Sequence, residues 1–260
     1  MKILNKTYNI NSSVNKKIVL ISDLHYKDKF DIERLNVILD NIKKLNPDFI
    51  CMPGDIIDKS RIDDEDTFII WIKELSKINK TIISIGNHEF YVNKAKGSYK
   101  LNKEFYNKLN NINNLYVLDN KNIIIDNINF IGITLPIKYY SKDNEKNFPD
   151  ILDELQIDKK IYNVLLCHSP INIYNNEKLK NKNINLILCG HMHGGVVFNF
   201  LRPIFKNRGI ISPNKVLFPK YAYGHLKVDN TDIIITSGCK VLPFKNLNKL
   251  FRPEVVIINL

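Results

Sequence analysis

Several features that would place a chain in a special class of protein are absent from these 260 residues. No run of about eighteen uncharged apolar residues occurs, and the start "MKILNKTYNINSSVNKK" has no apolar core of the signal-peptide type. None of the four cysteines has Cys-x-x-Cys spacing, and we expect buried thiols rather than disulfides. These absences predict a soluble protein of the cytoplasm.

Acidic residues are in deficit: 27 Asp and Glu stand against 38 Lys and Arg, which gives a formal net charge of +11. Such an excess suits an anionic partner, although a composition rich in Lys, Asn and Ile would produce it without one. The chain has no basic helix and no Arg-rich stripe with interleaved aromatics. Nucleic acid is therefore an open but not a favoured partner.

Short apolar runs predict strands that are covered on both faces. They lie at 17–22, 48–52, 81–85, 129–133, 163–167 and 185–189. Helical periodicity separates the first three, over 31–45 and 65–78, so the pattern predicts an α/β fold with crossover connections. After residue 220 three strand candidates follow closely and are expected to be antiparallel. No linker interrupts the chain, and we expect 1–260 to be one domain.

Polar side chains gather directly after these strands, and ligands commonly bind at the carboxyl ends of strands. The candidate metal ligands are Asp23, His25, Asp55, Asn87, His168, His191 and His193. Seven ligands are too many for one tetrahedral ion and suit two ions that share a bridging carboxylate. Imidazole, carboxylate and amide oxygen together favour Mn, Fe or Zn over Mg or Ca.

The motifs "SDLHY", "PGDIIDK", "GNHEF", "LLCHSP" and "CGHMHGG" follow one another along the chain. In this order they resemble the motifs of the calcineurin-like metallophosphoesterases. The resemblance implies a four-layer α/β/β/α sandwich with the metal site at the carboxyl ends of the strands. It also implies that Asp23, His25 and His193 bind a first metal, that Asn87, His168 and His191 bind a second, and that Asp55 bridges them.

The same resemblance implies the chemistry. A hydroxide held by two divalent ions, with Mn expected and Fe or Zn as alternatives, would attack phosphorus. His88 would contact the phosphate and protonate the leaving oxygen, and Asp58 would orient it, so these two are the candidate catalytic residues. Asn87, His88, Gly194 and Gly195 are the candidate substrate-binding residues.

A histidine pair followed by Gly-Gly resembles one branch of the family, which contains prokaryotic phosphodiesterases and enzymes similar to lipid-sugar pyrophosphatases. Val196 and Cys239 depart from that branch, where Gln and Gly are usual. We therefore expect a phosphodiesterase or pyrophosphatase acting on a small or lipid-sugar phosphate ester, in the cytoplasm or at the membrane periphery. A nuclease and a catalytically inactive metal-binding scaffold are the alternatives. The segment 196–220 is expected to form a substrate rim, with a membrane-surface contact or plain packing as alternatives.

Overall fold

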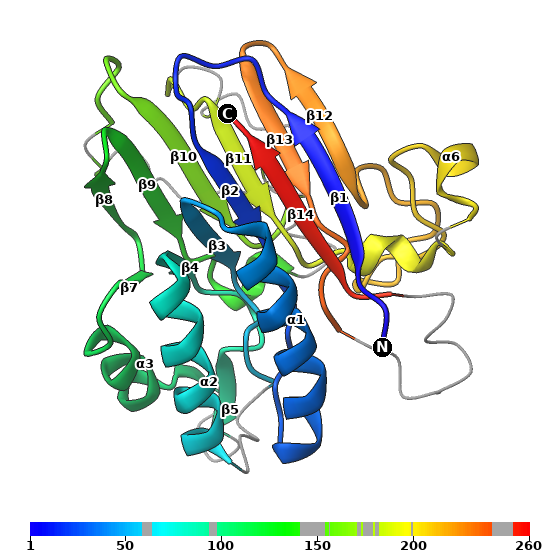
Figure 1. The fold of residues 1–260 in the computed structure, drawn as a ribbon. Coiled ribbons are helices and arrows are strands. Elements are labelled where there is room, and N and C mark those ends of the chain that lie inside the picture. Colours follow the sequence, from blue (N-terminus) through cyan, green and yellow to red (C-terminus); the bar gives the residue numbers. More distant parts are fainter. Residues whose placement is uncertain are drawn as a thin grey trace.

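The computed structural model describes residues 1–58, 64–93, 98–140, 154–155, 157–170, 173, 179, 182–198, 200–240 and 252–260. Two six-stranded sheets dominate this part of the chain, and helices cover one of them (Figure 1).

The first sheet combines the beginning, the first half and the end of the chain. Its strands, in spatial order, are β1 (Leu4–Asn9), β14 (Glu254–Asn259), β2 (Lys17–Leu20), β3 (Phe49–Pro53), β4 (Lys80–Ser84) and β7 (Leu115–Leu118). Only the β14–β2 pair is antiparallel, and the other neighbours are parallel. The strands predicted at 17–22, 48–52 and 81–85 are confirmed as β2, β3 and β4.

The second sheet has the spatial order β12 (Gly224–Val228), β13 (Thr231–Ile235), β11 (Leu186–Cys189), β10 (Tyr162–Cys167), β9 (Ile128–Ile133) and β8 (Lys121–Ile125). The pairs at its two edges are antiparallel, and the inner pairs are parallel. The expected antiparallel arrangement after residue 220 is right for β12 with β13, but β13 is parallel to its other neighbour, β11, and the third candidate, β14, lies in the first sheet. Close spacing identifies a hairpin, whereas β11 comes from a distant part of the chain. A separate hairpin pairs β5 (Phe90–Asn93) with β6 (Ser98–Leu101).

Two amphipathic helices, α1 (Ile32–Leu45) and α2 (Glu65–Ile78), pack side by side over the outer face of the first sheet (Figure 1). The apolar stripe of α2 is buried, and the Asp64 side chain caps its first turn by accepting from the Thr67 backbone N–H at 3.2 Å. The shorter helices are α3 (Lys103–Asn110) and α6 (Arg202–Phe205), with single turns η1 (Lys29–Asp31), η2 (Ile137–Tyr140) and η4 (His193–Val196). Of the helices in the described part of the chain, none combines the length and apolar character that a membrane span requires.

Alternation along the strands divides each apolar run between two cores. In β2, Ile18 and Leu20 pack between the two sheets, whereas Val19 packs toward the helices. A third core covers the outer face of the second sheet. The α/β sandwich of two sheets is thus confirmed. Within the described residues, side chains such as Tyr140 and Leu179 cover the second sheet's outer face.

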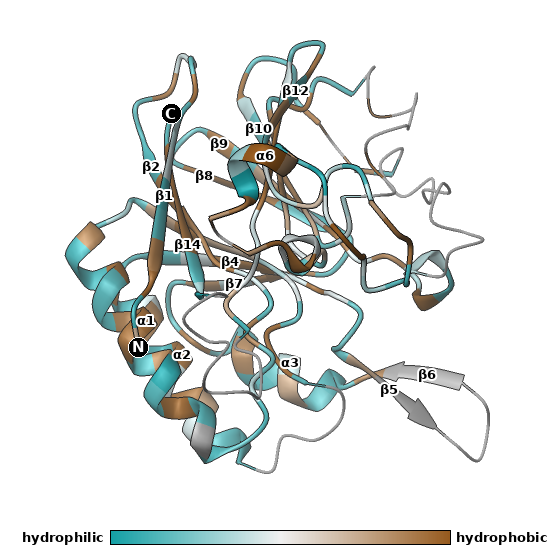
Figure 2. Cartoon of the chain, turned by 90° about the vertical axis from the view of Figure 1, so that its right-hand side faces the viewer, coloured by the Kyte–Doolittle hydropathy of each residue, from teal (hydrophilic) through white to brown (hydrophobic). Residues whose placement is uncertain are grey.

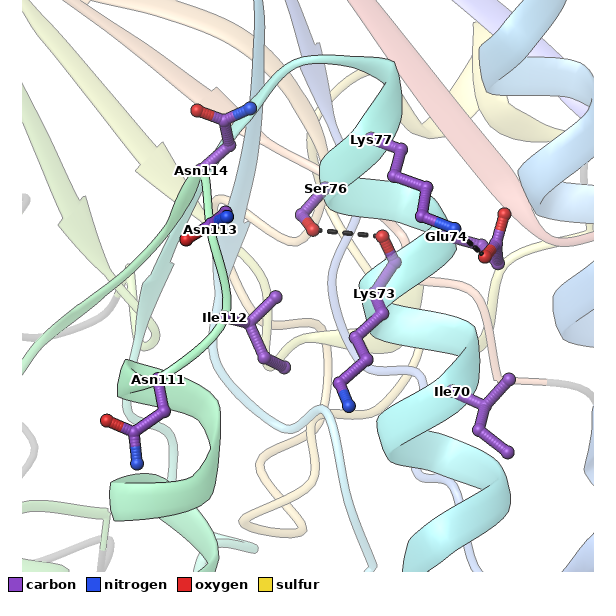
Figure 3. A pocket seen from close by; sticks show the side chains of 9 residues that line it. All are labelled: Ile70, Lys73, Glu74, Ser76, Lys77, Asn111, Ile112, Asn113 and Asn114. Atoms are coloured by element: carbon purple, nitrogen blue, oxygen red, sulfur yellow. Dashed lines mark hydrogen bonds and ion pairs between the residues drawn. The ribbon is translucent and has the colours of Figure 1, made fainter.

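A groove of about 390 Å³ separates α2 from the turn that follows α3 (Figure 3). Ile70, Lys73 and Ser76 line one side, and Ile112 and Asn114 line the other. Asn114 directly precedes β7, so this groove lies at the amino ends of the strands, opposite the edge where the polar motifs gather.

Candidate metal centre

The five motifs converge across the carboxyl ends of both sheets. Asp55 follows β3 of the first sheet and His168 follows β10 of the second, yet the Asp55 Oδ2 and His168 Nε2 atoms are 3.0 Å apart. The site therefore bridges the two sheets, which is how ligands from distant parts of the sequence meet.

The histidines and carboxylates form three overlapping groups of potential metal ligands, of which the group of His25, Asp55 and His88 shares one member with each of the other two. Asp23, His25 and His193 make up one of these two, with Asp23 Oδ1 at 3.9 Å from His25 Nε2 and 3.8 Å from His193 Nε2. Asp55, His168 and His191 make up the other. The two groups meet at Asp55, whose Oδ2 is also 3.7 Å from His25 Nε2. One carboxylate oxygen thus faces a histidine from each group.

Several polar atoms of this cluster are buried without a hydrogen-bond partner. These atoms are both ring nitrogens of His25, the Nε2 atoms of His168 and His191, and Asn87 Oδ1. Buried polar atoms are normally paired, and one ring nitrogen of each neutral histidine, like the amide oxygen of Asn87, offers a lone pair that suits a divalent ion. His168 is also oriented for ligation, because its Nδ1–H donates to the Pro53 carbonyl at 2.6 Å and leaves Nε2 facing the cluster. The donor set therefore fits divalent metal ions.

Electrostatics within the cluster favour neutral imidazoles at His191 and His193 but a positive charge at His168. Burial lowers the pKa of His191 and of His193, and charge on neighbouring histidines lowers the pKa of His191 further. Burial also opposes protonation of His168, but the carboxylates of Asp55 and Asp23 outweigh it and raise its pKa to about 9. These carboxylates stabilise a positive charge at this position, and a divalent ion would supply one.

The backbone at the cluster adopts conformations that side-chain-bearing residues rarely adopt. Positive φ angles occur at Asp23 (53°), His25 (45°), Asp55 (52°), His191 (67°) and His193 (46°). Each such residue costs free energy that the surrounding fold must offset, and such positions concentrate at functional sites. Five of the seven predicted ligands have this conformation, which supports a functional rather than a structural role for the cluster.

The motif glycines Gly86 and Gly190 are packed so closely against candidate ligands that a Cβ atom would overlap the ligand side chains. A Cβ on Gly86 would lie 2.4 Å from Asp55 Oδ1. A Cβ on Gly190 would lie 2.2 Å from Ser22 Oγ and 2.5 Å from Asp23 Oδ2. Side chains at these two positions would push the carboxylates out of the cluster.

His88 and Asp58 form a pair at the entrance to the cluster. The Nδ1 atom of His88 is 2.8 Å from Asp58 Oδ1, and its ring meets the His25 ring edge-on at 4.4 Å between centroids. The His88 backbone N–H donates to Asp55 Oδ1 at 2.8 Å. Its side chain is partly exposed, so this ring lies between the buried ligands and solvent.

Glu89 holds two of the motif loops together. One carboxylate oxygen accepts from the backbone N–H groups of Gly86 at 2.6 Å and Asp55 at 3.0 Å. The other accepts from Ile56 at 2.7 Å and Ile57 at 3.3 Å. Burial, reinforced by the charge of Asp55, raises the pKa of Glu89 to about 7. All four of these hydrogen bonds come from N–H donors, so among the described residues a protonated Glu89 would have no acceptor for its O–H. We therefore infer that Glu89 is ionised.

Glu89 and Tyr26 each directly follow a motif histidine in the sequence. The carboxylate of Glu89 supports the loops. Tyr26 is fully buried in the core beneath the helices and donates its hydroxyl to the Asp64 carbonyl, so it does not face substrate.

Gly194 and Gly195 are both buried with positive φ angles of 63° and 60°. A Cβ on Gly194 would meet Arg202 Nη2 at 2.8 Å, and one on Gly195 would meet the Gly209 Cα at 2.3 Å. The pair is therefore required by the close approach of the following segment. Its expected contact with substrate stays a prediction.

A pocket of about 230 Å³ adjoins the cluster at His193. Its walls are formed by His193, Val196, Arg202, Ser237, Gly238, Lys240 and Arg252. Three of these residues are cationic, and Arg202 pairs with Glu254 at 2.6 Å. Sequence reasoning missed Lys240 and Arg252, because neither belongs to a motif and they lie in separate segments.

The donor set fits divalent metal ions, and the family comparison agrees with a metal site. The calcineurin-like phosphoesterase family model matches residues 16–195, and the chain belongs to this family. Two relatives are uncharacterized metallophosphoesterases. The one from Helicobacter pylori is 27% identical over 71% of this chain and 46% of its own length. The other, YkuE of Bacillus subtilis, is 28% identical over 94% of this chain and 78% of its own length.

The chain thus spans about half the length of the Helicobacter pylori relative that it matches. Among solved structures, a dimetal phosphatase from Danio rerio is similar with a TM-score of 0.46 and 12% identity, covering 86% of this chain and 88% of that one. A novel archaeal phosphodiesterase is similar with a TM-score of 0.41 and 12% identity, covering 86% and 84%.

Proposed function

We propose that this protein is a two-metal phosphohydrolase that cleaves phosphodiester or pyrophosphate bonds. The observation that carries the proposal is the position of Asp55, whose Oδ2 faces His168 of one ligand group and His25 of the other. Membership of the calcineurin-like phosphoesterase family supports the same reaction class.

In this proposal the first ion is held by Asp23, His25 and His193 and the second by Asn87, His168 and His191, with Asp55 bridging. We favour Mn, with Fe or Zn as alternatives, because imidazole combined with carboxylate and amide oxygens suits these three ions better than Mg or Ca. Divalent ions bound there supply Lewis-acid stabilisation of phosphoryl oxygens and activation of water.

His88 is the proposed acid. Asp58 Oδ1 lies 2.8 Å from His88 Nδ1, where it would accept an Nδ1–H and leave Nε2 to donate to the leaving oxygen. The partial exposure of the ring allows this proton to be replaced from solvent. Asp58 acts through His88 and is a positioning residue.

Charge and space support the choice of substrate class. Two divalent ions carry four positive charges, of which Asp23 and Asp55 neutralise two, so the site favours an anionic phosphate ester. The cationic pocket beside His193 offers room for a further part of the substrate, as a pyrophosphate or a phosphodiester would require. Gly194 and Gly195 stand in the sequence between two lining residues of this pocket, His193 and Val196, and are proposed to approach the substrate with Asn87 and His88.

Three further predictions belong to the proposal, on the family branch, the domain organisation and the location of the protein. We place the chain in the branch with a GHxHGG motif on the strength of residues 190–195. We treat residues 1–260 as one domain, because β14 near the end of the chain pairs with β1 and β2. We expect the protein to act in the cytoplasm or at the membrane periphery.

Metal analysis and a single substitution test the proposal. The purified protein should contain close to two transition-metal ions per chain and hydrolyse bis(p-nitrophenyl) phosphate. His88→Ala should keep both ions and lower kcat by about 10²- to 10⁴-fold. His225→Ala is the matched control, because His225 pairs with Asp232 on the edge of the second sheet and belongs to none of the ligand groups.

Full hydrolysis by metal-free protein would refute the two-metal reaction, and loss of metal from His88→Ala would refute the division of roles. Supercoiled plasmid and single-stranded DNA serve as alternative substrates. Degradation of either at a higher kcat/KM than small diesters would establish the nuclease instead. An inactive scaffold would bind metal without any turnover.

A further inference from the structure

The segment 196–220, which follows the last ligand histidine, exposes an unusual share of the large apolar side chains. Eight such side chains are exposed in the described part of the chain, and five of them lie here: Val196, Phe200, Ile204, Leu217 and Phe218. Ile204 is 75% exposed, and Phe200 and Leu217 are each 67% exposed. Apolar side chains gathered in this way on one segment mark an interaction surface.

This segment is also purely cationic. Residues 178–228 include no Asp or Glu at all. Lys206, Arg208, Lys215 and Lys220 are exposed, and none of them forms an ion pair with a carboxylate among the described residues. The surface thus combines apolar side chains with uncompensated positive charge.

Backbone hydrogen bonds hold the segment against the metal centre. The Ile210 N–H donates to the Gly195 carbonyl at 2.7 Å, and the Phe218 N–H donates to the Ile210 carbonyl at 2.9 Å. Phe218 and Lys215 adopt positive φ angles of 51° and 61°. An ordered backbone in a costly conformation, with its apolar side chains turned to solvent, indicates a functional surface rather than a loosely packed loop.

We propose that the segment 196–220 docks onto a lipid surface that carries anionic headgroups. Apolar side chains inserted at the headgroup boundary, together with lysines and arginines near the phosphates, are the combination that holds proteins at such interfaces. The helix α6 with Ile204 projects from the body of the molecule (Figure 1), and the view onto this side shows its hydrophobic residues in brown (Figure 2).

Lipid fits this surface better than nucleic acid does. The phosphates of a nucleic acid would use the lysines, and Phe200 and Phe218 could stack on bases. The aliphatic side chains of Ile204 and Leu217 can neither stack on a base nor form a hydrogen bond with its edge, whereas all of these apolar side chains can insert into lipid.

Val196 and Arg202 belong both to this segment and to the pocket beside His193. Docking therefore brings the pocket toward the lipid surface. The importance of this position for catalysis rests on the proposed function.

Vesicle co-sedimentation of the metal-loaded full chain tests the proposal. The protein should sediment with phosphatidylcholine vesicles that contain phosphatidylglycerol, and far less with phosphatidylcholine alone. Leu217→Asp and Phe218→Asp should each weaken partitioning to the vesicles about tenfold or more. Each substitution removes an apolar contact with the lipid and adds a negative charge that the anionic headgroups repel. The matched control is Ile70→Asp, since Ile70 is 62% exposed, as Phe218 is, but lies on α2.

The charge contribution is tested separately with substitutions at exposed lysines that are expected to leave the fold intact. Lys215→Gln should weaken binding to the anionic vesicles about fivefold, which corresponds to about 1 kcal/mol per basic residue near such a surface. Lys121→Gln, on β8, is the control and should bind as the wild type does.

Three outcomes would overturn the proposal. The first is a wild-type protein that ignores anionic vesicles, and the second is an equal loss of binding in Ile70→Asp and Phe218→Asp. The third is a wild-type dimer, seen by sedimentation velocity, that the Phe218→Asp substitution dissociates without changing vesicle binding. That result would show that the surface contacts a second copy of the chain. Vesicle binding is measured without substrate, so a protein that binds the vesicles but does not hydrolyse bis(p-nitrophenyl) phosphate in a separate assay would keep this proposal and reject the proposed function.

Discussion

Replacement of Glu89 by Gln is the sharpest test of how the metal centre is held together. Glu89 is buried, and its two carboxylate oxygens accept four backbone N–H groups, two per oxygen. Gln has the same shape but replaces one oxygen with an NH₂ group. Whichever way the amide turns, two backbone N–H groups then face a donor instead of an acceptor.

The expected loss of stability follows from that count. A buried donor left without its acceptor costs about 1–3 kcal/mol, so two of them cost about 2–6 kcal/mol. That is a large part of the about 5–15 kcal/mol that separates folded from unfolded states in typical domains. The loops concerned carry Asp55 and Asn87, so metal affinity should fall together with stability.

Urea unfolding followed by circular dichroism measures the first effect, and titration of chelated protein with Mn²⁺ measures the second. Glu74→Gln is the control: it removes a carboxylate whose partner is Lys77 on the surface of α2, and both measurements should match the wild type. If Glu89→Gln cannot be purified, Glu89→Asp keeps the charge but shortens the reach and should weaken both properties.

An unchanged unfolding free energy in Glu89→Gln would refute the reasoning. It would mean that residue 89 is protonated in the folded protein, because a carboxylic acid and an amide then present equivalent groups to the backbone. Burial, which raises the pKa of Glu89, would in that case outweigh the four N–H donors.

The remaining predictions concern the ligands and the acid. Asp58→Asn should keep two metals per chain while lowering kcat by up to about 10²-fold with a smaller change in KM, because His88 loses its charged partner; metal loss would contradict this. Gly190→Ala should lower metal affinity by about 10- to 100-fold, as its Cβ would lie 2.5 Å from Asp23 Oδ2; calorimetric titration measures it, and unchanged affinity would show that the loop adapts. Chelation should lower the Tm, since metal at a hundred times its Kd stabilises a folded chain by about 2.7 kcal/mol; an unchanged Tm would argue against ligation by the folded site.

Much of the framework could be inferred from local patterns. The apolar runs at 17–22 and 163–167 predicted buried strands, and periodicity over 65–78 predicted α2 with its bounds. The weakly apolar strand β1 and the hairpin of β5 and β6 were not predicted. Their side chains alternate too weakly for a period to stand out, and pairing with a neighbour is what makes them strands.

For the candidate site, motif order was enough to name the seven candidate ligands, because each follows a strand whose apolar run can be recognised in the sequence. The grouping of these ligands was expected only from the resemblance to a family. Their distances depend on how the two sheets pack, and so does the orientation of Asp55 toward histidines from both. The four hydrogen bonds that Glu89 accepts could not be predicted from the sequence either, since their N–H donors lie in two different loops.

Residues adjacent in the chain therefore specify which side chains are available at each strand end and which segments become helices or strands, because these preferences act over a few residues. Contacts between distant segments follow from packing alone. Lys240 and Arg252 reach the pocket beside His193, and Leu217 and Phe218 stay on the surface next to uncompensated lysines, because of how the chain closes over its cores. No local pattern specifies that closure, since it is set by the sum of many weak contacts between segments far apart in sequence.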